Sequence, residues 1–86
     1  MNTVENFELK FANTYPEFTK NLVLKIHDIT PQEIKICMCI KMSFTNTQTR
    51  QLLKISESTL ANLRSGIRKK LALKRAESLI NTILLI

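Results

Sequence analysis

The chain has 86 residues, of which 44% are hydrophobic and 23% are charged, and its formal net charge is +6. This length allows one small domain, and this apolar content excludes a disordered tail. With one glycine and two prolines, the chain has too few turn residues for a β-sandwich or barrel, so we predict a compact all-α fold.

Two helices are predicted in the first third of the chain, from apolar residues at three- and four-residue intervals. Phe7 and Phe11 indicate a helix over about residues 3–13. Pro16 suits the first position of a second helix, over about residues 16–27. The apolar stripe of this second helix consists of Phe18, Leu22 and Ile26.

A third helix is predicted to begin at Thr30-Pro31-Gln32-Glu33. Thr30 can cap this helix, Pro31 fits its first turn, and Glu33 can complete a capping box by reaching back to residue 30. The predicted inner face of the helix consists of Ile34, Cys37, Met38 and Met42.

Two further helices, joined by a tight turn, are predicted between Thr45 and Leu71. Thr45 with Gln48 repeats the capping-box spacing and opens a helix at about 46–54, and Ser56 caps the next helix. The pair shares one apolar seam, formed by Leu52, Leu53, Ile55, Leu60, Leu63, Ile67 and Leu71. The opposite side of the second helix carries Ser58, Asn62, Ser65 and Lys69. A helix packed on one side, with small polar groups and a cation on the other, is typical of a helix-turn-helix that inserts into the DNA major groove.

The residues from about 75 to 86 predict a last helix, whose apolar surface is larger than a small core needs. We expect part of this surface to pack on the N-terminal helices and part to contact a second subunit. The predicted homodimer contact consists of Leu79, Ile80, Ile83 and Leu84.

The charge is unevenly distributed. Residues 1–40 carry four Lys or Arg against five Asp or Glu, a balance of −1, whereas residues 41–86 carry nine against two, a balance of +7. A basic half suits a nucleic-acid partner, because each neutralised phosphate releases condensed counterions. On charge alone, a solvated helix face is the alternative. The cations predicted to contact phosphates are Lys54 at the turn and Arg68, Lys69, Lys70, Lys74 and Arg75 after it.

Residues capable of catalysis or metal binding are few. Cys37 and Cys39 stand about 200° apart around a helix, so a strain-free disulfide between them is excluded, and His27 adds too few ligands for a zinc site. We interpret Cys37 as a small core residue and Cys39 as a partly exposed one. Since no nucleophile motif and no glycine-rich phosphate loop is present, we expect a protein that is not an enzyme and needs no metal or cofactor.

No stretch of the sequence approaches about 18 uncharged apolar residues. The N-terminus, which reads Met1-Asn2-Thr3-Val4-Glu5, lacks the basic and apolar regions of a signal peptide. We therefore expect a cytoplasmic protein that does not associate with membranes.

From residue 30 onward the sequence resembles the LuxR/GerE-type DNA-binding domain. The resemblance rests on T-P-Q-E, L-L-K-I-S, S-x-x-T-L and I-x-x-K-L, in this order and spacing. These motifs comprise Thr30, Glu33, Leu52, Ile55, Ser56, Thr59, Leu60, Ile67, Lys70 and Leu71. The version at the C-termini of Bacteroidota regulators is most similar, since an F…F…P-x-F…L segment precedes its helix-turn-helix. We therefore divide the chain into an N-terminal helical extension, 1–29, and a LuxR-like domain, 30–86, within one compact unit.

The resemblance implies a DNA-binding transcriptional regulator that acts as a homodimer, with a recognition helix at about 56–71. A variant of this function is a role like that of sigma region 4, in which the protein reads a promoter beside RNA polymerase as a further partner. It implies base contacts at Ala61, Asn62 and Ser65, to which the helical geometry adds Ser58. It implies phosphate contacts at Ser56, Thr59, Lys69 and Lys70.

The sequence also departs from the family pattern. Thr49 stands where the family has an apolar residue, Arg50 where it has a small alanine, and Ala61 where it often has a lysine. These departures leave an alternative function open. In that alternative the helix-turn-helix scaffold binds a protein, as an interaction or anti-regulator module.

Overall fold

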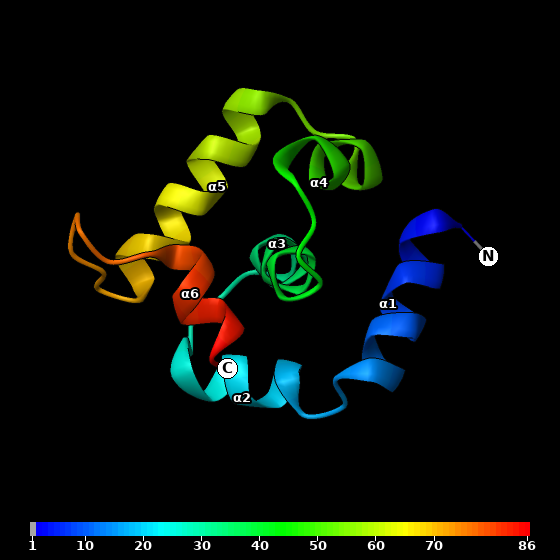
Figure 1. Ribbon diagram of the computed structural model, residues 1–86, viewed down its shortest axis with the longest axis horizontal. Coiled ribbons are helices and arrows are strands. Elements are labelled where there is room, and N and C mark those ends of the chain that lie inside the picture. Colours follow the sequence, from blue (N-terminus) through cyan, green and yellow to red (C-terminus); the bar gives the residue numbers. More distant parts are fainter. Residues whose placement is uncertain (1) are drawn as a thin grey trace.

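The computed structural model describes residues 2–86, which contain six α-helices and no strand (Figure 1). The helices are α1 (Thr3–Thr14), α2 (Phe18–Lys25), α3 (Pro31–Lys41), α4 (Asn46–Leu53), α5 (Glu57–Lys70) and α6 (Leu79–Leu84). The predicted all-α fold is therefore confirmed. None of these helices is long and apolar enough to cross a membrane.

The third helix lies at the centre of the fold. Figure 1 shows α3 along its axis, with the other helices arranged around it. Of its predicted inner face, Cys37 and Met38 are buried, whereas Ile34 and Met42 are only half-buried. The prediction that Cys39 is partly exposed is wrong, because its exposed fraction is 0%. A helix that has neighbours on most sides buries residues all round its axis and not along one stripe.

Both thiols of α3 are free and buried. Burial raises the pKa of Cys37 to about 12 and the pKa of Cys39 to about 11. Since the thiolate is the reactive form of cysteine, these side chains are inert at neutral pH. Their contribution is to packing, as predicted for Cys37.

The two N-terminal helices pack into the same hydrophobic core as the later ones. Phe11 of α1 and Phe18 of α2 are almost fully buried and lie edge to face, with ring centroids 5.2 Å apart. The buried cluster comprises Phe11, Phe18, Leu22, Ile26, Ile36, Cys37, Met38, Ile40, Leu60, Ile67, Leu79 and Ile83. Residues 2–29 and 30–86 therefore share one core and form one structural unit.

The helix starts follow local sequence signals. The hydroxyl of Thr30 accepts a hydrogen bond from the Glu33 N–H, and the Glu33 carboxylate accepts one from the Thr30 N–H, so the predicted capping box is confirmed. Thr45 and Gln48 form the same reciprocal pair at the start of α4. The hydroxyl of Ser56 caps α5, as predicted.

The start of the second helix differs from the prediction. Helix α2 begins at Phe18 and ends at Lys25, whereas the sequence predicts a helix over about 16–27 with Pro16 at its first position. The Phe18 N–H donates to the Tyr15 carbonyl over 3.2 Å, so Pro16 lies in a turn that precedes the helix. This turn directs α2 away from α1.

The last helix is shorter than predicted. It spans Leu79–Leu84 and not 75–86, because the residues before Ser78 form a turn instead. In this turn the Lys74 N–H donates to the Glu77 carboxylate over 2.9 Å. The hydroxyl of Ser78 then accepts from the Asn81 N–H and caps the helix at that point.

The four residues predicted to form the dimer contact divide into two pairs. Leu79 and Ile83 are 3% and 0% exposed and belong to the core, so their prediction as a subunit interface is wrong. Ile80 and Leu84 are 46% and 39% exposed. With only six residues in α6, one face packs inward on the core and the other faces solvent.

Candidate nucleic-acid interface

Helices α4 and α5 are joined by a turn of three residues. Lys54 ends α4 in the left-handed conformation, with φ 55° and ψ 50°, and Ser56 caps α5. Leu60 and Ile67 of α5 are buried. Their half-buried neighbours in the core are Leu53, Ile55, Leu63 and Leu71. The predicted seam therefore faces inward, except that Leu52 is half-buried outside this cluster.

The outer face of α5 carries the residues predicted to contact bases. Ser58, Ala61, Asn62 and Ser65 are all exposed. They are small enough for the helix backbone to approach another surface closely. Asn62 is the only one of the four whose side chain carries both a donor and an acceptor in a fixed amide plane.

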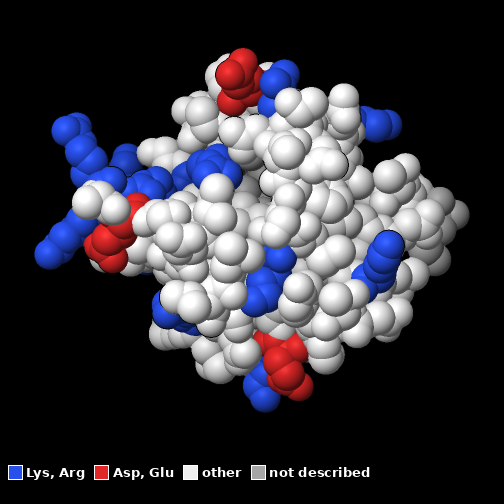
Figure 2. Space-filling model, in the orientation of Figure 1, with Lys and Arg blue, Asp and Glu red and all other residues white. Residues whose placement is uncertain are grey.

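The residues predicted to contact phosphates differ in availability. Lys54, Lys69 and Lys74 are exposed. Figure 2 shows lysine and arginine side chains gathered at one end of the molecule, over the end of α5 and the loop that follows it. The hydroxyls of Ser56 and Thr59 are exposed but hydrogen-bond each other over 2.9 Å.

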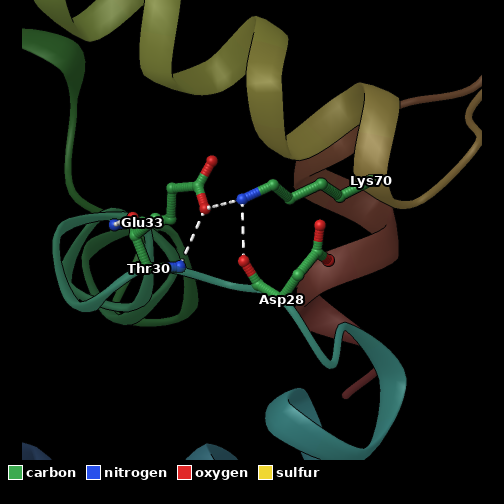
Figure 3. A network of polar contacts seen from close by, with 4 residues as sticks. All are labelled: Asp28, Thr30, Glu33 and Lys70. Atoms are coloured by element: carbon green, nitrogen blue, oxygen red, sulfur yellow. Dashed lines mark hydrogen bonds and ion pairs between the residues drawn. The ribbon is translucent and has the colours of Figure 1, made fainter.

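Lys70 is bound within the fold (Figure 3). Its ammonium group lies 2.7 Å from a carboxylate oxygen of Glu33 and donates to the Asp28 carbonyl over 2.9 Å. The same Glu33 oxygen also accepts the N–H of Thr30. The cation predicted for a phosphate thus joins the end of α5 to the start of α3.

Gly66 makes room for this carboxylate. It is the single glycine of the chain and lies inside α5, where glycine costs stability relative to alanine. A Cβ added at this position would lie 3.2 Å from the second carboxylate oxygen of Glu33. The absence of a side chain at residue 66 therefore lets the Glu33 carboxylate approach α5.

Arg68 holds the loop between α5 and α6. Its guanidinium donates to the carbonyls of Lys74 and Glu77, over 2.8 and 2.9 Å. The side chain is half-buried. The prediction of Arg68 as a phosphate contact rests on its place in the basic half of the chain. The carbonyls that accept its hydrogen bonds belong to a loop, whose conformation no periodic pattern predicts.

The carboxyl of Glu33 makes the stability of the domain dependent on pH. Burial raises its pKa, but hydrogen bonds from Lys70 and Thr30 lower it by more, so the net pKa lies below its ordinary value of 4.5. A lowered pKa stabilises the fold above pH 4.5, and this contribution is lost as the pH falls through the folded-state pKa.

We expect the free energy of unfolding to decline below pH 4.5 in the parent protein, and to decline less in Glu33→Gln, which has no carboxyl at that position. Urea unfolding at pH 7, 5, 4 and 3 measures this difference. Glu8→Gln, on α1 away from the network, is the matched control and should follow the parent. If the free energy of unfolding falls equally with pH in the parent and in Glu33→Gln, the Glu33 carboxyl is not the cause of the pH dependence.

The two departures in α4 have different consequences. Thr49 is 5% exposed, and its hydroxyl donates to the Thr45 carbonyl over 2.9 Å, so it is accommodated as a buried, hydrogen-bonded residue. Arg50 is half-buried, and its Nε is buried with no hydrogen-bond partner among residues 2–86. With Arg64 and Arg68 it lines a hollow between α4 and α5. The sequence indicates Arg50 as a departure from the family pattern and Arg68 as a phosphate contact, but it does not predict that the two line one hollow with Arg64.

The chain is thus a small all-α domain in which a pair of helices joined by a tight turn presents a polar, cation-flanked helix face. Comparison with protein-family models, with curated proteins and with solved structures gives no significant match.

Proposed function

We propose that this protein is a DNA-binding transcriptional regulator that inserts α5 into the major groove. The observation that carries the proposal is the exposed face of α5. Its small residues Ser58, Ala61, Asn62 and Ser65 lie on the side opposite the buried Leu60 and Ile67. The major groove admits one α-helix, and only short side chains allow such a helix to approach the base edges.

The charge around this face supports the same function. Lys69 and Lys74 follow the polar face at the end of α5, and Lys54 precedes it in the turn, all three with exposed side chains. Cations at the two ends of a helix that lies in the major groove can neutralise phosphates on the two strands that border the groove. The resemblance of the sequence motifs to the LuxR/GerE-type domain points to the same function.

Asn62 is the residue we expect to read a base, because its amide can pair bidentately with N6 and N7 of adenine. Asn62→Ala should cost about 1–3 kcal/mol of binding to the preferred duplex and relax selectivity at one base pair. Its stability should change by less than about 0.5 kcal/mol, since the side chain is exposed.

Selection of binding sites from random duplexes, with the parent and with Asn62→Ala, tests the proposal. Asn21→Ala, an exposed position on α2, is the matched control and should keep the parent selectivity. Identical site preferences for all three proteins would remove Asn62 from the recognition surface. If the parent binds no duplex at low salt, the alternative of a protein-binding module replaces the DNA-binding proposal.

The proposal includes a homodimer formed through the exposed side of α6. Ile80 and Leu84 present apolar surface there, and Leu85 beside them is 88% exposed. Contiguous exposed apolar side chains are typical of protein contacts. A two-fold dimer matches a palindromic DNA site, since each α5 then reads one half-site.

A further inference from the structure

The hollow between α4 and α5 is lined by an unusual concentration of arginine. It has a volume of about 450 Å³, and its lining residues are Asn46, Thr47, Arg50, Glu57, Leu60, Ala61, Arg64, Ser65 and Arg68. Three of the lining residues are arginines and one is a glutamate. This excess of positive charge in a concave site favours an anion.

The cations of the hollow lack acidic partners. Among residues 2–86 the sole ion pair joins Lys70 and Glu33, so neither Arg50 nor Arg64 is neutralised by a carboxylate. The Nε of Arg50 is buried without an acceptor. A buried donor with no acceptor destabilises the fold. In the part of the chain that the structure describes, the charge of Arg50 is thus compensated neither by a carboxylate nor by a hydrogen bond to Nε.

The surroundings of Arg64 indicate the same need for negative charge. Burial lowers the pKa of Arg64, and the nearby charge of Arg68 lowers that pKa further. Arg68 is held in place by its two bonds to loop carbonyls, so this repulsion persists in the folded protein. An anion between the two guanidinium groups would relieve it.

The start of α4 borders the same hollow. Asn46 and Thr47 are the first two residues of α4, whose backbone N–H groups have no acceptor within the helix. The capping box at this end uses the N–H groups of Thr45 and Gln48 instead. The helix start therefore adds partial positive charge to that of the arginines.

We propose that this hollow is a phosphate-binding site in which Arg50 and Arg64 contact the phosphate oxygens. Guanidinium groups suit this ligand because their paired N–H donors match two oxygens of one phosphate. Arg68 also lines the hollow and adds positive charge to it. Glu57, the one acidic residue among those described around the hollow, disfavours further negative charge, which suits a single phosphate group.

The phosphate can come from the DNA backbone or from a free phosphorylated compound. In the first case the site anchors one DNA strand beside α5. This source rests on the proposed function and deepens it. In the second case the ligand binds in the absence of DNA, although the hollow shares Ala61 and Ser65 with the proposed reading face. The chemistry of recognition is the same, so the experiment has one arm for each source.

The first arm measures the melting temperature of the protein in inorganic phosphate and in sodium chloride at equal ionic strength. We expect phosphate to raise Tm by roughly 4 °C or more above chloride at saturating concentration. Arg50→Met should reduce the difference to the general stabilisation that phosphate, as a kosmotropic salt, gives folded proteins. Arg75→Met, which removes the same charge from an exposed position outside the hollow, should keep it. If Arg50→Met does not fold, Arg50→Lys makes the comparison, since it keeps the charge and loses the paired donors.

The second arm measures duplex affinity of the same variants. If the DNA backbone is the source, Arg50→Met should weaken binding about tenfold more than Arg75→Met, and inorganic phosphate should compete with the duplex. Phosphate-dependent stabilisation without duplex binding supports the free-phosphate source and overturns the proposed DNA function alone. Duplex binding that both variants weaken equally, with the same phosphate effect on Tm in the parent and in Arg50→Met, overturns the phosphate site and leaves the proposed function standing.

Discussion

Replacing Ile83 by Asp is expected to unfold the domain. Ile83 is 0% exposed and belongs to the core cluster. Its substitution removes about 1.5–3 kcal/mol of apolar burial, and burial of an unpaired carboxylate costs several kcal/mol more. A domain of this size has roughly 4–13 kcal/mol of stability in total. Far-UV circular dichroism at 25 °C should therefore show the loss of most helical signal.

Ile80→Asp is the matched control on the same helix. Ile80 is 46% exposed and stands in the first turn of α6, where a carboxylate interacts favourably with the helix dipole. We expect its stability to stay within about 1 kcal/mol of the parent. A parent-like melting curve for Ile83→Asp would contradict the assignment of Ile83 to the core.

The same control tests the proposed homodimer. Sedimentation of the parent at high concentration should show a dimer, and Ile80→Asp should shift the protein to a monomer with unchanged helix content. A parent that stays monomeric would remove the dimer from the proposal. A monomer is informative only for a variant that stays folded, such as Ile80→Asp. Ile83→Asp cannot test the dimer, since an unfolded variant also fails to associate.

Lys69 and Lys70 are adjacent, but we expect alanine at position 69 to weaken DNA binding and alanine at position 70 to lower the stability of the fold. Lys69 is exposed, so Lys69→Ala should weaken binding to all duplexes by several-fold and reduce the slope of log K against log salt by about 1, at unchanged stability. Lys70 is paired with Glu33 at 2.7 Å. Lys70→Ala should therefore lower stability by about 1–3 kcal/mol and leave the salt slope near the parent value.

Duplex binding measured between 50 and 300 mM salt, with urea unfolding of each variant, tests this pair. Lys10→Ala, an exposed lysine on α1, is the control for a general loss of charge and should change neither quantity appreciably. If Lys70→Ala flattens the salt slope as much as Lys69→Ala does, the Lys70 ammonium leaves the Glu33 carboxylate and contacts a phosphate when DNA binds. If no variant alters the slope, the end of α5 does not contact DNA.

Interactions between residues close in sequence could be predicted from the sequence. The capping boxes at Thr30 and Thr45 join residues three positions apart, and their hydrogen bonds form in any chain that turns into a helix there. The inward seam and exposed polar face of α5 follow from its helical period, as the burial of Leu60 and exposure of Asn62 show. The sequence by itself thus determined the all-α class and the composition of the candidate reading face.

Contacts between residues far apart in sequence were decided only by the tertiary structure. Lys70 meets Glu33 across 37 positions, which turns a predicted phosphate contact into a link between α5 and α3. Cys39 is buried because α3 is enclosed on most sides, and Ile83 because α6 packs its inner face on the core. The hollow around Arg50 likewise requires α4 and α5 to come together. Periodicity reports which face of a helix is apolar, whereas the neighbours that enclose that helix and pair with its charges depend on the packing of the whole chain.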